Sequence, residues 1–173
     1  MPPAAHFDWT TLDFSKVVGG REELRRANPQ RFEMEQLDGI VYIDFEQQLI
    51  VGYKDVRPDE FWVRGHMPGY PLMPGVLMCE AAAQICSFYV MQTDLLQGDF
   101  IGFGGLEDVR FRGVVRPGDR FVLVGKGLKL KSRQTIFNVQ GFVGPTMVFH
   151  ADVIGVPLSR PGAAAGSATA GEA

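Results

Sequence analysis

The amino-acid sequence predicts an α+β fold in which a curled antiparallel sheet wraps one long central helix. Two observations lead to this prediction. Residues 74–91 form an apolar segment whose large side chains would point in nearly all directions around a helix axis, so the helix must be covered on most sides. Two β-patterned segments precede this helix and four follow it, separated by turn residues. With 173 residues, 46% of them apolar, one domain can bury such a core.

The elements before the long helix are short. Residues 1–19 are weakly patterned and form a lead-in to the domain. Residues 21–27 are expected to form a helix that stops at Asn28-Pro29, because a residue before proline disfavours the helical conformation. Two apolar segments, residues 40–45 and 49–53, flank the polar Glu46-Gln47-Gln48 and predict a β-hairpin.

The long helix follows a loop at residues 57–73 and begins with Pro74, which suits a first turn because its missing N–H would have no intrahelical acceptor. The apolar run of residues 72–91 is interrupted by Glu80 and Gln84. These interruptions are typical of a buried helix and argue against a membrane span.

Four further strands are expected at residues 100–111, 120–130, 134–143 and 146–156. From residue 158 the composition falls to mainly Ala, Gly, Ser and Thr, which predicts a disordered tail over residues 158–173. The folded domain is therefore expected to span residues 20–157.

Composition and charge exclude several functions. A net charge of −3 provides no global field to attract nucleic acid. The first residues, Met1–His6, lack the basic and apolar regions of a secretory signal, so we expect a cytoplasmic protein. Cys79 and Cys86 would lie about 10 Å apart on the helix, too far to pair, and are interpreted as small apolar fillers. No Cys/His cluster has metal-ligand spacing, so a metal site is not expected.

The loop before the long helix contains the first candidate catalytic residue. Three prolines and three glycines between Gly65 and Gly75 fix the path of the chain, which indicates that His66 is held in a required position. The alternative is that His66 only caps the loop by hydrogen bonding. His6, in the N-terminal segment, and His150, in a strand, are expected to have no catalytic role.

The helix supplies two further candidates. Glu80 is a carboxylate in an otherwise apolar segment, where it must be paired or protonated. The alternative places Glu80 on an exposed stripe with Gln84, four residues later. Gly75 lies at the helix start, where backbone N–H groups lack intrahelical acceptors and can bind an oxyanion. A histidine base, a carboxylic acid and these amides suit proton abstraction next to a carbonyl.

Other motifs carry less information. Gly102-Phe103-Gly104-Gly105 does not have a phosphate-binding spacing and is expected to be a glycine-rich strand or bulge. Two groups of basic residues either form ordinary solvated faces or dock an acidic carrier protein. The basic residues are Arg110, Arg112, Arg116 and Arg120, and Lys126, Lys129, Lys131 and Arg133.

The loop and the helix start together resemble a known family, the β-hydroxyacyl-acyl-carrier-protein dehydratases of bacterial fatty-acid synthesis. The family motif reads Gly-His-Phe-Pro-Gly-x-Pro-Val-Met-Pro-Gly-Val-Leu, followed by Glu-Ala-x-Ala-Gln. This chain matches the motif from Gly65 to Gln84, with Met67 for the phenylalanine and Leu72 for the valine. The stretches 108–112 and 115–119 resemble the family's later strand and turn, so the resemblance covers about residues 20–156.

The resemblance implies the hotdog fold and dimers with two sites, often assembled further into hexamers. It implies that His66 is the catalytic histidine and that Glu80 of the partner subunit is the acidic residue. Gly75 would donate its backbone N–H to the thioester carbonyl, and Gln84 would support Glu80. A glutamate instead of an aspartate at position 80 favours the branch that dehydrates without isomerising the double bond.

The expected reaction is loss of water from a (3R)-3-hydroxyacyl-acyl-carrier-protein to give the trans-2-enoyl product, without a cofactor, in fatty-acid or related lipid synthesis. Two departures bear on carrier recognition and chain length. The family's Leu-Pro-His-Arg-Tyr-Pro-Phe stretch is replaced by residues 28–34, and Tyr70 replaces a common arginine. The alternative is a hotdog protein that binds acyl chains, or serves as a partner subunit, without turnover. An acyl thioesterase is less favoured, since hydrolysis needs an activated water.

Overall fold

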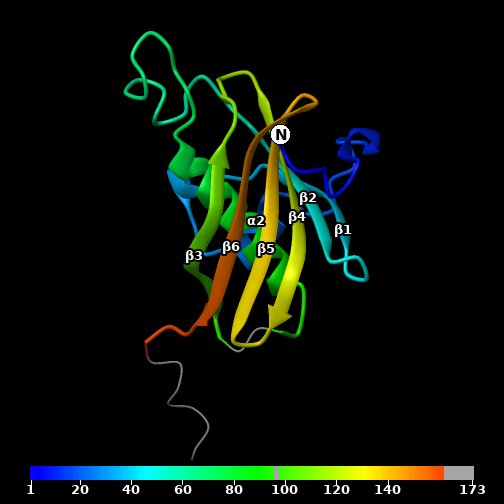
Figure 1. The fold of residues 1–173 in the computed structure, drawn as a ribbon. Helices are drawn as coiled ribbons and strands as arrows, with labels where there is room; N and C mark the ends of the chain where they lie inside the picture. The colour runs from blue at the N-terminus through cyan, green and yellow to red at the C-terminus, as the bar shows by residue number, and fades with distance from the viewer. Residues whose placement is uncertain (96–97, 162–173) are drawn as a thin grey trace, which may run out of the picture.

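A single antiparallel sheet dominates the computed structural model, which describes residues 1–95 and 98–161. Within these residues the sheet has six strands in the order β1-β2-β4-β5-β6-β3, and Figure 1 shows that order across its face. All five neighbouring pairs are antiparallel. The strands are β1 (Gly39–Asp44), β2 (Leu49–Asp55), β3 (Phe100–Phe111), β4 (Arg120–Lys131), β5 (Gln134–Val143) and β6 (Thr146–Leu158).

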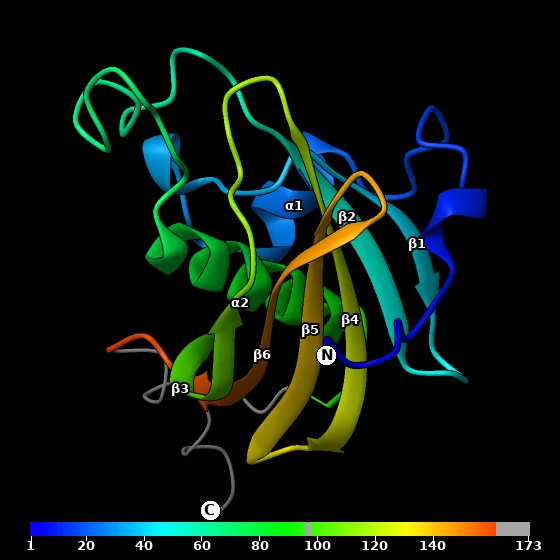
Figure 2. The same ribbon diagram turned by 45° about the horizontal axis from the view of Figure 1, so that its top comes forward.

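The helix α2 (Gly75–Met91) lies in the concave face of the curled sheet, as Figure 2 shows. Its residues Ala81, Ala82 and Ile85 are completely buried. Burial continues around most of the helix because the sheet covers one side and α1 (Arg21–Ala27) packs on another. The predicted hotdog arrangement, a curled antiparallel sheet around one long helix, is therefore confirmed.

The N-terminal segment is more structured than its pattern suggested. It carries the short 3-10 helix η1 (Trp9–Thr11) and packs on the opposite face of the sheet, where it covers a second apolar cluster. Trp9 lies 5.8 Å from Phe142, and Phe7 stacks on Tyr42 at 4.8 Å, measured between ring centroids. The lead-in is thus a strap that keeps the outer face of the sheet from water.

Most element boundaries agree with the sequence prediction, with small differences at the ends. Pro74 is the residue that precedes α2, so the helix itself begins at Gly75. Strand β6 extends to Leu158, one residue into the predicted tail, and residues 162–173 of that tail lie outside the described residues. Strand β3 changes register between Phe103 and Gly105, at the glycine-rich stretch expected to form a strand or bulge.

Candidate active site

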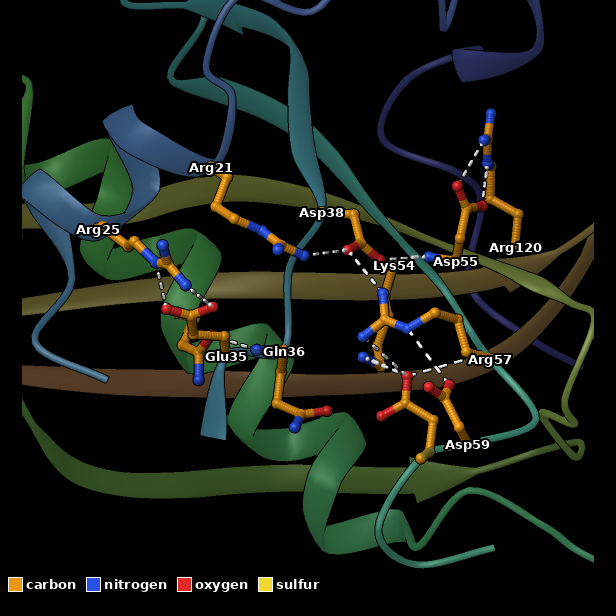
Figure 3. A network of polar contacts seen from close by, with 12 residues as sticks. Arg21, Arg25, Glu35, Gln36, Asp38, Lys54, Asp55, Arg57, Asp59 and Arg120 are labelled. Atoms are coloured by element: carbon orange, nitrogen blue, oxygen red, sulfur yellow. Dashed lines mark hydrogen bonds and ion pairs between the residues drawn. The ribbon is translucent and has the colours of Figure 1, made fainter. Parts of the chain in front are cut away.

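The loop between β2 and α2 is attached to the sheet by a buried ion pair. Lys54 Nζ on β2 lies 2.9 Å from Glu60 Oε1, and the two side chains are only 1% and 6% exposed. Arg57 adds a contact of 3.8 Å to the same carboxylate oxygen and one of 3.3 Å to Asp38. Figure 3 shows Lys54, Arg57 and Asp38 in this network. The first residues of the loop are therefore fixed before the chain reaches the histidine.

Hydrogen bonds then fix His66 and its tautomer. The carbonyl of the buried Trp62 accepts the backbone N–H groups of Gly65 at 3.1 Å and His66 at 2.8 Å. The backbone N–H of Leu72 donates to the His66 carbonyl at 2.9 Å, and the Leu72 carbonyl accepts from His66 Nδ1 at 2.9 Å. A carbonyl only accepts, so the neutral ring carries its proton on Nδ1 and leaves Nε2 as a base. The hydrogen bond expected for a loop-capping histidine is therefore present, but it uses only Nδ1 of the His66 ring.

His66 and the start of α2 line the same cavity, which has a volume of about 340 Å³. The N–H groups of Leu77 and Met78 donate to the Pro74 carbonyl, at 2.9 and 3.3 Å. The N–H groups of Gly75 and Val76 have no acceptor among the described residues. The lining residues are His66, Leu72, Met73, Gly75, Val76, Met78, Phe111, Gly113 and Val114.

Gly75 allows a close approach between the helix start and a side chain of β3. A Cβ at this position would lie 2.7 Å from Phe111 Cζ and 2.8 Å from Cε1. Carbon atoms in good contact are about 3.5–4.0 Å apart, so any larger residue would push the Phe111 ring. The absent side chain thus lets an aromatic ring from β3 lie against the helix start.

The Glu80 carboxylate is partly buried and held by two amides. Its Oε1 accepts from Gln84 Nε2 at 2.8 Å and from Gln30 Nε2 at 3.0 Å. Gln84 is only 3% exposed; its Oε1 accepts the backbone N–H of Gln36, and its Nε2 also donates to the Met34 carbonyl. The exposed-stripe alternative is therefore wrong for Gln84, which is buried, and Glu80 is partly buried with both amides on its Oε1.

Glu80 faces a second cavity, of about 310 Å³, that shares no lining residue with the first among the described residues. Within one chain, His66 and Glu80 are therefore not brought to a common cavity. The second cavity has mainly apolar walls and lies between α2, β3 and β6. Its lining residues are Pro29, Gln30, Glu80, Ala83, Cys86, Ser87, Phe100, Ile101, Gly102, Phe103, Val153, Ile154, Gly155 and Leu158.

The sequence identifies Gln84 as a partner of Glu80, but it does not identify Gln30. Gln30 precedes Glu80 by 50 residues and has no periodic relation to it. The available signal was the stretch of residues 28–34, which departs from the family's usual sequence.

The other candidates have local partners. Arg110 lies 3.1 Å from Asp108, and Arg120 lies 2.6 Å from Asp55. His150 is buried and lies 3.2 Å from Arg112 and 3.4 Å from Asp108. In residues 1–95 and 98–161, no group of three or more His, Cys, Asp or Glu side chains could hold a metal ion. In the same ranges, none of the helices has the length and apolar character needed to cross a membrane.

Comparison with known proteins yields one family and several relatives. Residues 28–152 match the family described as FabA-like domain. The chain is 31% identical over 133 residues to the 3-hydroxyacyl-[acyl-carrier-protein] dehydratase FabZ of Clostridioides difficile (strain 630), covering 77% of this chain and 93% of that protein. It is 38% identical over 111 residues to the FabZ dehydratase of Clostridium botulinum (strain Eklund 17B / Type B), covering 64% and 78%.

Solved structures show the same fold at low sequence identity. The dehydratase heterocomplex ApeI:P from Xenorhabdus doucetiae gives a TM-score of 0.65 at 13% identity, covering 78% of this chain and 90% of that chain. A hypothetical thioesterase protein with coenzyme A from Streptococcus pneumoniae TIGR4 gives a TM-score of 0.52 at 13% identity, covering 68% and 82%. Because dehydratases and a hypothetical thioesterase share this fold, the fold alone does not select the reaction.

Proposed function

Since this chain belongs to the FabA-like domain family, we propose that it is a 3-hydroxyacyl-[acyl-carrier-protein] dehydratase of fatty-acid synthesis. We assign the chemistry to His66 and Glu80 and the binding of the thioester carbonyl to the N–H of Gly75. One observation carries this assignment. His66 Nδ1 bonds to the Leu72 carbonyl, which leaves Nε2 as a base in the cavity that also contains the free N–H of Gly75.

The geometry supports an elimination in which charge develops near the helix start. The thioester oxygen accepts from the Gly75 N–H, and His66 Nε2 takes the proton from C2 of the substrate. The electrons of that C–H bond form the C2–C3 double bond as the C3–O bond breaks. Glu80 protonates the departing hydroxyl, which leaves as water. Return of the proton from His66 to Glu80, through solvent, restores both groups.

The two groups line separate cavities in one chain, so the proposal places Glu80 of the partner subunit opposite His66 in a homodimer. Several apolar side chains of the loop before α2, of the helix start and of the end of β3 and the residues after it are exposed in the single chain, and they support such an interface because exposed apolar surface marks interaction sites. They are Met67, Tyr70, Val76, Phe111 and Val114. Further assembly of dimers into hexamers, a cytoplasmic location and acyl-carrier protein as the bound carrier belong to the same proposal.

The first test is the hydration of crotonyl and longer 2-enoyl thioesters on acyl-carrier protein and on coenzyme A, with wild type and His66→Ala side by side. Wild type should turn over at least one thioester. His66→Ala should lose turnover while thermal stability changes by no more than about 1 kcal/mol, because the side chain is only half-buried. A folded wild type that binds acyl chains but turns over no thioester would instead favour the binding or partner-subunit alternative.

Mixing two inactive variants tests the shared site. A dimer of one His66→Ala chain and one Glu80→Gln chain has one site with both groups intact and one with neither. After subunit exchange at equal amounts, half of the dimers are mixed, so about a quarter of the wild-type activity should return. Sites contained within single chains predict no recovery, and that result would refute the cross-subunit arrangement.

A further inference from the structure

The two amides that hold Glu80 bind the same oxygen of its carboxylate. Gln84 Nε2 donates to Glu80 Oε1 at 2.8 Å and Gln30 Nε2 donates to it at 3.0 Å. A carboxyl oxygen has two lone pairs, and two donors occupy both. Glu80 Oε2 has no partner among the described residues, and the side chain lines the apolar second cavity.

Hydrogen bonds hold the segment of residues 28–31, which carries Gln30. The Arg31 guanidinium donates to three backbone carbonyls, those of Arg25 at 2.8 Å, Asn28 at 2.8 Å and Gln30 at 2.5 Å. The buried Asn28 side chain donates to the Gln84 carbonyl at 3.0 Å, which attaches the segment to α2 one turn after Glu80. The Gln30 amide therefore approaches the carboxylate from a rigid support.

We propose that Gln30 is a positioning residue for the dehydration, in addition to Gln84, and that the two amides select which oxygen of Glu80 exchanges a proton with substrate. The inference rests on the proposed function. With both lone pairs of Oε1 engaged, the proton of the acid form resides on Oε2, the oxygen without a protein partner. When that proton is given to the departing hydroxyl, the two N–H groups stabilise the carboxylate that remains.

Gln30 adds something that Gln84 alone does not. Gln84 stands four residues after Glu80 on the same helix, so its bond follows from helix geometry and constrains the carboxylate from one side. Gln30 comes from outside the helix and blocks rotation of the carboxylate away from the cavity. The only other titratable side chain lining this cavity among the described residues is Cys86, whose pKa is raised by burial, so the thiol stays protonated.

The experiment compares steady-state kinetics of wild type, Gln30→Leu and Gln30→Met on the thioester that wild type prefers. Both variants remove the amide donor, and Gln30→Met preserves the length of the side chain without adding a donor or a charge. We expect kcat to fall about tenfold or more, out of the roughly 10²–10⁴-fold that a positioned general acid supplies, with KM within about twofold. Gln30→His retains a ring N–H donor and should recover most of the lost kcat. Glu33→Gln, at an exposed position in the same segment, is the matched control and should equal wild type.

A double-mutant cycle separates positioning from a general structural defect. In a Glu80→Gln background, measured at high enzyme concentration, Gln30→Leu should lower the residual rate no further, because the proton it positions is gone. The role of Gln30 would be overturned, and the proposed function left standing, by an equal fold-loss of kcat in both backgrounds. A kcat within about twofold of wild type for both donor-free variants would have the same meaning. Absence of turnover by wild type would overturn the proposed function and this inference with it.

Discussion

The buried ion pair between Lys54 and Glu60 makes a quantitative prediction about the loop that carries His66. Lys54→Met removes the cation and leaves a carboxylate that is 6% exposed, without its partner at 2.9 Å. Breaking a buried pair in this way costs about 3–5 kcal/mol. The half-exposed Arg57, 3.8 Å from the same oxygen, compensates in part, so we expect the low end, about 3 kcal/mol.

The double variant Lys54→Met/Glu60→Leu tests whether the unpaired Glu60 carboxylate causes the stability loss of Lys54→Met. It buries no charge and fills a similar volume, so it should be more stable than Lys54→Met and within about 1–2 kcal/mol of wild type. Urea unfolding at pH 7, at one fixed protein concentration because a dimer is expected, gives the three free energies. A Lys54→Met loss below about 1 kcal/mol, or a double variant less stable than the single one, would refute the reasoning.

Three further predictions concern other sites. Gly75→Ala places a Cβ 2.7 Å from Phe111 Cζ, and because that ring is 52% exposed it can shift at a cost of about 1 kcal/mol or less. The shifted ring should raise KM as it moves into the His66 cavity, and unchanged kinetics would contradict this. The hydrogen bond with Arg25 lowers the pKa of Glu35 from its ordinary value of 4.5. The ionised Glu35 therefore stabilises the fold fully above pH 4.5, and this stabilisation is lost as the pH falls through the lowered pKa. Glu35→Gln should therefore lower urea stability by at most about 1 kcal/mol at pH 7 and by less near pH 3, whereas equal losses would count against the pair. Burial raises the pKa of Cys86, so a disulfide reagent at pH 8 should modify it only after unfolding; rapid native labelling would show that the thiol is accessible.

The sequence predicted the sheet and the long helix well because both depend on strong local periodicity. Alternating and continuous apolar segments place the strands within a few residues of their observed bounds, and the wrapped helix starts one residue after Pro74. The N-terminal strap could not be predicted in this way. Phe7 and Trp9 pack through contacts with Tyr42 and Phe142, far along the chain, and no periodic pattern in residues 1–19 announces such contacts.

In the candidate site too, the residues close together in the sequence were predictable and the contact between distant residues was not. His66, Gly75, Glu80 and Gln84 lie within 20 residues of one another and could be selected from their local chemistry and the family motif. The hydrogen bond from Gln30 to Glu80 joins positions 50 residues apart, so only the folded chain reveals it. Lys54 directly follows the predicted strand 49–53, whereas β2 extends to Asp55, so neither the burial of Lys54 nor its pair with Glu60 was predicted.

The two groups proposed to react, His66 and Glu80, line different cavities of one chain. Glu80 follows Gly75 by five residues, which on an α-helix is about 140° around the axis and about 7.5 Å along it. The Glu80 side chain therefore leaves α2 on a different side from position 75, toward the cavity at β3 and β6, while Gly75 lines the His66 cavity. In the proposed dimer, a two-fold axis brings the second cavity of one chain against the first cavity of its partner. Recovery of activity from mixed inactive variants is the direct consequence of this arrangement.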